Sequence, residues 1–174
     1  MNANHVPLEE SADHWLAGLP PVVSPQTAVL VLGSFPSARS LVAREYYAHP
    51  HNQFWKILQA IWPRNPLPAR YPQRCEWLLE RGLGLWDVYA RCRRAGSLDA
   101  AIRDAQPNDI AGLRLPRLAA IAHNGAESHR QARHAAALGV PAYRLPSSSP
   151  AHAAMRFDDK ACAWRTVMAR HGLV

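Results

Sequence analysis

The chain of 174 residues has the length of a single domain, and its 48% of hydrophobic residues suffices for a sizeable core. A formal charge of +7 and a pI near 9.9 favour a polyanionic partner such as nucleic acid, although arginine so far outnumbers lysine that a GC-rich coding sequence explains the charge equally well. Three widely spaced cysteines without a CxxC pair argue against a disulfide framework, a structural zinc site and a four-cysteine iron–sulfur cluster.

No apolar stretch is long enough to cross a membrane, and the first 15 residues lack the basic and apolar segments of a secretion signal. We therefore expect a cytoplasmic protein without a membrane partner. Neither an internal repeat nor a long linker divides the chain. Residues 1–174 are thus predicted to form one domain, with residues 1–25 as an N-terminal helical extension.

The predicted elements alternate between helices and short apolar strands. In chain order they are a helix at 9–19, a buried strand at 28–32, helices at 53–62 and 72–81, a strand at 84–89, a capped helix at 97–102, a helix capped by Asn108, a buried strand at 118–122, a helix at 125–138, a strand at 141–145 and a closing helix at 157–171. Short strands separated by helices imply a parallel sheet covered on both faces. The expected fold class is α/β, a three-layer α/β/α domain around a mostly parallel four-stranded sheet.

Polar turns follow three of these strands. Ser34–Ser37 follows the first strand, His123-Asn124-Gly125 follows the third, and residues 146–152 follow the fourth. In parallel sheets ligands collect at the carboxyl ends of strands. The sequence therefore predicts that the three turns converge on one ligand site.

Five segments carry the most specific pattern of the chain. They read LVLGSFPSARSL, EYYAHPHNQFWKIL, GLGLWDVYARCRRAGSLDAAI, IAHNGAES and LPSSSPAHA, and they cover most of the chain from Val29 to Ala153. In this order they resemble the uracil-DNA glycosylase superfamily, and within it the hypoxanthine (deoxyinosine) DNA glycosylase branch. The resemblance implies a monomeric, cofactor-free base excision repair enzyme. It would flip a deaminated base, with hypoxanthine favoured, out of damaged duplex or single-stranded DNA and hydrolyse its N-glycosidic bond.

The first motif departs from the pattern of uracil-removing members, which usually carry Asp or Asn between its glycine and its proline. This chain has Ser34-Phe35 there. The hypoxanthine branch shares the absence and relies on the Asn of HP-x-N-x-FW, so the resemblance assigns catalysis to Asn52. Its carbonyl oxygen would orient water near the oxocarbenium-like sugar. The alternative is a loop amide that caps the helix starting at Gln53.

Candidate base-binding residues are aromatic or carry an amide. Phe35, Tyr47 and Phe54 could stack on a flipped base or pack in the core, and Phe54 is favoured because it stands close to Asn52. Asn124 offers a donor and an acceptor to a purine edge, or forms an Asx turn at the end of its strand.

Short hydroxyl side chains suit phosphate oxygens, so the two serine-containing turns are candidate contacts with the DNA backbone. The residues are Ser34, Ser37, Ser147, Ser148, Ser149 and His152. A plain polar loop is the alternative for the serines, and a surface histidine is the alternative for His152.

The remaining predictions concern reaction type. His49 and His51 lack metal-ligand spacing with any carboxylate, so no metal is expected. No lysine falls among the candidate site residues, so we expect water rather than a Schiff base to act on the sugar. The alternative functions are a mismatch-specific uracil or thymine DNA glycosylase and a non-catalytic DNA- or nucleotide-binding module on the same fold.

Overall fold

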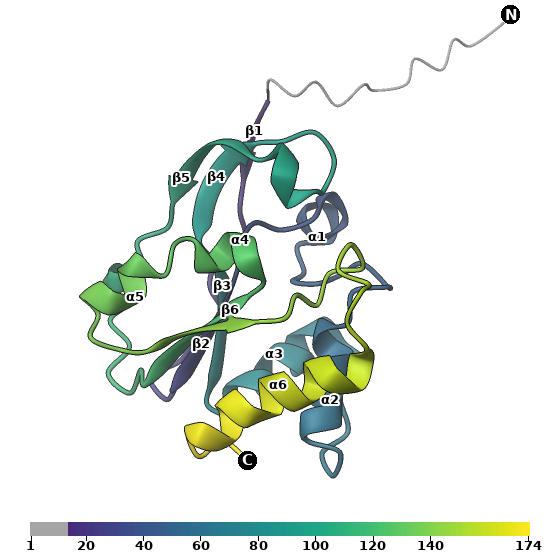
Figure 1. Ribbon diagram of the computed structural model, residues 1–174, viewed down its shortest axis with the longest axis vertical. Coiled ribbons are helices and arrows are strands. Elements are labelled where there is room, and N and C mark those ends of the chain that lie inside the picture. Colours follow the sequence, from purple (N-terminus) through teal and green to yellow (C-terminus); the bar gives the residue numbers. More distant parts are fainter. Residues whose placement is uncertain (1–13) are drawn as a thin grey trace, which may run out of the picture.

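The computed structural model of the protein describes residues 14–174, except for the side chains of residues 134 and 135. Its centre is a four-stranded sheet in the order β3–β2–β6–β7 (Figure 1). The strands are β2 (Val29–Gly33), β3 (Leu83–Asp87), β6 (Ala120–Asn124) and β7 (Ala142–Leu145). All three pairings are parallel, so the carboxyl ends of the four strands meet at one edge. The predicted α/β fold with a four-stranded parallel sheet is confirmed.

The described part of the chain also forms six α-helices. They are α1 (Ala38–Ala43), α2 (Phe54–Ile61), α3 (Tyr71–Leu79), α4 (Ala126–His129), α5 (Arg133–Ala137) and α6 (Phe157–Arg170). Side chains of β2 alternate between two cores, as the two-residue period of a strand requires. Val29 and Val31 face α2, α3 and α6, whereas Leu30 and Leu32 face the opposite core. Figure 1 shows α2, α3 and α6 grouped together, apart from α4 and α5.

A second, antiparallel sheet was not predicted. Its order is β1–β4–β5, formed by β1 (Trp15–Ala17), β4 (Tyr89–Arg93) and β5 (Arg103–Pro107). Only Val88 separates β3 from β4, so the chain passes directly from one sheet to the other. The predicted strand at 84–89 thus spans the end of one strand and the start of the next.

The predicted helix at 9–19 is wrong where the structure describes it, and so is the helical extension. Trp15–Ala17 pairs antiparallel with Arg91–Arg93, and Val22 forms a bridge with Leu85. The Arg91 guanidinium lies 4.1 Å from the centroid of the Trp15 ring. Pairing with a distant strand therefore outweighs the local helix propensity. Residues 1–13, which hold the rest of the predicted helix and of the extension, lie outside the described part.

Three further helix predictions need correction. Residues 99–101 form a single 3₁₀ turn, η1 (Asp99–Ala101), because β5 follows at once and pairs with β4. Asn108 does not cap a helix: its Nδ2 donates to the Asp87 carbonyl, and the next turn is η2 (Ala111–Leu113). The helix at 125–138 is divided into α4 and α5, since the amides of Gln131 and Ala132 bond three residues back.

The helix α1 was not predicted. Ser37 caps it, with its Oγ accepting from the Ser40 amide at 3.1 Å. No helix in the described part of the chain is long and apolar enough to cross a bilayer.

Candidate active site

The carboxyl edge of the parallel sheet opens into a cleft of about 520 Å³. Its walls come from the turn after β2, the loop before α2, the end of β3, the η1 turn, the start of α4 and the serine loop after β7. The convergence of polar turns expected from the strand order is confirmed. Of the predicted site residues, all except Phe54 line the cleft.

Asn52 lies on the wall of the cleft, in the loop before α2. Its Oδ1 accepts a hydrogen bond from the Phe54 amide at 2.9 Å, so it does cap the first turn of the helix. Among the described residues no group bonds to its Nδ2. Next to it, the Gln53 amide donates to the Ser148 carbonyl at 2.9 Å and ties this loop to the serine loop. Capping thus holds the Asn52 amide in place at the cleft and leaves one Oδ1 lone pair for a ligand or water.

Of two stacked aromatic candidates, Tyr47 lines the cleft and Phe54 lies buried beneath it. Tyr47 lines the cleft and stacks on Phe54, with ring centroids 4.1 Å apart and planes tilted by 23°. Phe54 is fully buried and also meets the edges of Trp55 and Trp164. The predicted direct stacking of Phe54 on a base therefore does not fit, because α2 turns its side chain into the core beneath Tyr47.

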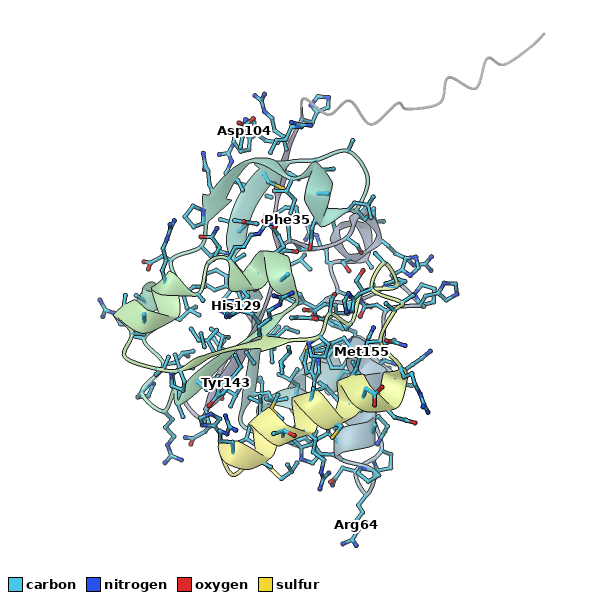
Figure 2. The ribbon with its side chains drawn as sticks, viewed as in Figure 1. Phe35, Arg64, Asp104, His129, Tyr143 and Met155 are labelled. Carbon is cyan, nitrogen blue, oxygen red and sulfur yellow. The ribbon has the colours of Figure 1, made fainter. Side chains whose placement is uncertain are left out.

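Phe35 lines the cleft but is largely buried. The Arg94 guanidinium lies 5.2 Å from its ring centroid. Figure 2 shows Phe35 inside the molecule between the second sheet and α4, whereas Arg64 and Asp104 project at opposite ends. Phe35 thus offers little of its surface to an incoming base.

Asn124, the last residue of β6, is already engaged by the protein. Its Nδ2 donates to the Tyr47 hydroxyl at 3.0 Å and to Ser148 Oγ at 2.8 Å. Its Oδ1 accepts from the Ser148 amide at 2.8 Å. Both donors are therefore used, and one acceptor lone pair remains for a base. Asn124 chiefly positions Tyr47 and the serine loop.

The predicted backbone-binding residues differ in access. Ser148 is fully buried and bonded to Asn124, so a contact with a DNA phosphate does not fit its position. Ser147 and Ser149 are half-buried, and each Oγ accepts from an amide two residues on. His152 is exposed and lines the cleft.

The serines after β2 also have partners within the protein. Ser34 is buried, and its Oγ donates to Asp99 Oδ1 at 2.6 Å. Ser37 caps α1 and remains half-buried at the cleft. The loop after β2 is therefore fixed by its own hydrogen bonds before any ligand enters.

Asp87 was missed by the sequence reading. It is the last residue of β3, lines the cleft beside Gly33 and is 3% exposed. A Cβ at Gly33 would lie 2.4 Å from Asp87 Oδ1 and 3.1 Å from the Tyr47 hydroxyl. Among the described residues, no group bonds to the buried Asp87 Oδ2. Its position at a strand end, within the GLGLWDV segment, was the available signal.

The protonation of Asp87 follows from its surroundings. Burial, the largest cause, and the neighbouring Asp99 raise the pKa of this carboxyl, the Arg94 guanidinium lowers it, and the net value is about 8. The group is therefore mostly neutral at pH 7. Asp99, which was also missed, has its own pKa raised by burial, while the hydrogen bond from Ser34 opposes that shift.

Lys160 in α6 is the third residue that the sequence did not single out, and it connects two loops that line the cleft. It is 1% exposed, and its Nζ donates to Gln53 Oε1 at 3.0 Å and to the His152 carbonyl at 2.7 Å. One ammonium thus holds the Asn52 loop and the serine loop together. Among the described residues, no cluster of three His, Cys, Asp or Glu side chains could hold a metal ion.

Comparison with known proteins places this cleft in a family. Residues 20–170 match the model of the uracil DNA glycosylase superfamily. A hypoxanthine DNA glycosylase of Methanosarcina acetivorans is 34% identical over 157 residues, which cover 88% of this chain and 98% of the relative. One of Methanosarcina barkeri is 35% identical over 137 residues, 78% of this chain and 87% of the relative.

A solved structure gives the same result. The solution NMR structure of a candidate uracil DNA glycosylase from Methanosarcina acetivorans superposes with a TM-score of 0.79 at 30% identity. The match covers 90% of this chain and 98% of that one. From its sequence, its fold and the cleft at its sheet edge, the chain belongs to the uracil DNA glycosylase superfamily.

Proposed function

We propose that the chain is a monofunctional DNA glycosylase of base excision repair with hypoxanthine as its favoured base. The observation that carries this is the position of Asn52, an amide fixed at the wall of a polar cleft by its bond to the Phe54 amide. The names of the Methanosarcina relatives support hypoxanthine as the substrate.

The reaction begins with a base that leaves the DNA stack and enters the cleft. Tyr47, held by Phe54 and Asn124, offers it an aromatic face. As the glycosidic bond lengthens, the sugar gains oxocarbenium character. The carbonyl oxygen of Asn52 then orients water toward the sugar and faces its positive charge.

Water is the nucleophile in this proposal. No lysine stands among the described residues that line the cleft, so no side-chain amine is placed to form a Schiff base. The product is an abasic site with an intact strand. We expect the enzyme to act as a monomer on damaged duplex or single-stranded DNA, without a cofactor and in the cytoplasm.

A strand-nicking assay tests the proposal. Labelled duplexes with one deoxyinosine, deoxyuridine or mismatched thymidine are incubated with the protein in EDTA and then treated with or without alkali. We expect alkali-dependent cleavage at deoxyinosine. Asn52→Ala should lower base release by at least about 100-fold, because it removes the group that positions water, and should leave DNA affinity within a few-fold.

Asn65→Ala is the matched control, since Asn65 is an exposed asparagine outside the cleft. It should behave as the unmodified protein does. Cleavage at deoxyuridine alone would make the protein a uracil glycosylase instead. Binding without cleavage of any substrate would leave a DNA-binding module. Full activity of Asn52→Ala would refute the assigned catalytic role.

A further inference from the structure

The floor of the cleft holds an acid that the mechanism above does not use. Asp87 ends β3 directly beside Gly33, and the missing side chain at Gly33 leaves the space that its carboxyl occupies. The residue is almost wholly buried, yet it lines the cleft. Buried polar atoms in proteins nearly always have a partner. The Asp87 Oδ2 is one of several buried polar atoms that have none in the described part of the chain, and among them it alone belongs to a residue that lines the cleft, which points to a group that arrives with the substrate.

Burial and a neighbouring carboxyl keep Asp87 protonated. Asp99 faces it from η1, Arg94 from the segment after β4, and Tyr46 and Tyr47 from the loop after α1. Burial and Asp99 together outweigh Arg94, and the pKa of Asp87 rises to about 8. Burial also raises the pKa values of both tyrosines, which therefore stay neutral.

A neutral carboxyl has one O–H donor, whereas a carboxylate has none. To act as a base on the attacking water, Asp87 would first have to ionise, which its surroundings oppose. To act as an acid it is already in the required form. The reaction still requires a proton donor, because the departing base gathers negative charge.

We propose that Asp87 is a catalytic residue that donates its proton to the departing base; this rests on the glycosylase function proposed above. The C1′–N bond breaks with its electron pair on the base, and the Asp87 proton passes to the base atom that faces it. Water adds to C1′, and the proton it loses returns through solvent to Asp87. One water is consumed, and the base leaves neutral.

Asp87→Asn tests this step, because the amide keeps the shape and a hydrogen-bond donor but has no transferable proton. Base release from a deoxyinosine duplex is measured in single-turnover reactions from pH 5.5 to 9. In the unmodified enzyme the rate should fall as pH rises through about 8. Asp87→Asn should be about 100-fold slower, as expected for loss of a general acid. Its pH–rate profile should also lack this decline near pH 8, which we call the alkaline limb. DNA affinity should stay within a few-fold.

Two further variants identify the group whose ionisation causes the alkaline limb of the pH–rate profile. Asp99→Asn removes a neighbouring negative charge and should move the limb to lower pH. Asp109→Asn alters an exposed aspartate outside the cleft and should change neither rate nor limb. Any limb that persists in Asp87→Asn belongs to another group, such as the base itself.

The outcomes separate the two proposals. If the unmodified protein releases no base from any substrate, the proposed function fails and this step fails with it. If it does release base, and Asp87→Asn keeps its rate or its limb, only the Asp87 proposal is wrong. Should Asp87→Asn not fold, the limb near pH 8 and its shift in Asp99→Asn decide, and absence of either refutes the proposal.

Discussion

Two buried titratable side chains flank β2, and they differ in access rather than in burial. Asp87 pairs in register with Gly33, and His123 of β6 pairs with Leu32. This offset of one residue turns the two side chains toward opposite faces of the sheet. Both stay neutral near pH 7, because burial raises the pKa of Asp87 to about 8 and lowers that of His123 to about 4.

The surroundings of His123 are closed to the cleft, although its Nε2, like the Asp87 Oδ2, has no partner among the described residues. Its Nδ1 lies 2.7 Å from Ser128 Oγ, and that hydroxyl donates to the Leu32 carbonyl at 2.8 Å. His123 does not line the cleft, whereas Asp87 does. A shifted pKa therefore reports burial on both sides of β2, and access to the cleft is what distinguishes a reactive group from a structural one.

The largest expected effect comes from closing the gap beside Asp87. Gly33→Ala places a methyl group 2.4 Å from Asp87 Oδ1, so the buried carboxyl has to move from its place in the cleft floor. Base release should fall by about 100-fold or more through misplacement of the cleft floor. Stability should fall by about 1–3 kcal/mol, as overpacking does. Single-turnover assays and urea unfolding measure the two effects.

Gly112→Ala is the matched control for that variant. A Cβ there also lies 2.4 Å from an aspartate oxygen, that of Asp109, but both residues are exposed and the side chain can swing away. It should retain activity and stability. Equal loss in the two variants would show that the cleft floor has no special rigidity.

The pH dependence of stability should differ between the two sides of β2. Asp87 holds its proton in the folded state, whereas the unfolded group releases it near pH 3.8, so this residue makes stability fall as pH rises from about 4 to about 8. His123 excludes a proton that the unfolded residue binds below about pH 6.5, so it makes stability fall as pH drops toward 4.

The two contributions overlap below about pH 6.5, and above it Asp87 dominates. Asp87→Asn should remove the decline in stability between pH 6 and 8, which is on the order of 2 kcal/mol. His123→Leu should remove the loss of stability that His123 causes between pH 6 and 4.5, also on the order of 2 kcal/mol. Urea unfolding at pH 4.5, 6 and 8, followed by tryptophan fluorescence, measures both. If Asp87→Asn keeps the decline between pH 6 and 8, or if His123→Leu removes it, the titrating groups have been assigned wrongly.

The smallest expected effect concerns the aromatic wall. Tyr47→Phe keeps the stack on Phe54 but removes the hydroxyl that accepts from Asn124. Base release should fall by about 3- to 10-fold, the value of roughly 1 kcal/mol for one lost hydrogen bond. Tyr143→Phe removes a comparable hydroxyl, 3.1 Å from His171 Nε2 and outside the cleft, and should leave activity unchanged.

The parallel sheet could be predicted because each of its strands carries its own apolar run or lies beside a helical pattern. The antiparallel sheet could not. Its strand β5 reads RDAQP, which is polar and ends in proline, and it is a strand only because β4 lies alongside. Residues 15–17 likewise depend on a partner more than 70 positions away.

The candidate site, like the fold, was predictable in part. Strand order sufficed to predict that the polar turns meet, since parallel strands end at one edge. Sequence adjacency did not show which face of α2 carries Phe54, nor that Ser148 turns inward to Asn124. Asp87 was overlooked because an aspartate after an apolar strand gains meaning only once Gly33 is known to lie beside it.

The buried position of Lys160 has a practical consequence for labelling. The protein has two lysines, and Lys160 is enclosed while Lys56 is exposed on α2, one turn beyond Asn52. Of the two lysines, an amine-reactive fluorophore would thus react with Lys56 and spare Lys160. Thiol reagents discriminate less well, since Cys162 is exposed and Cys75 half-exposed. The native chain therefore offers an attachment point for a dye beside the cleft, with no engineered residue.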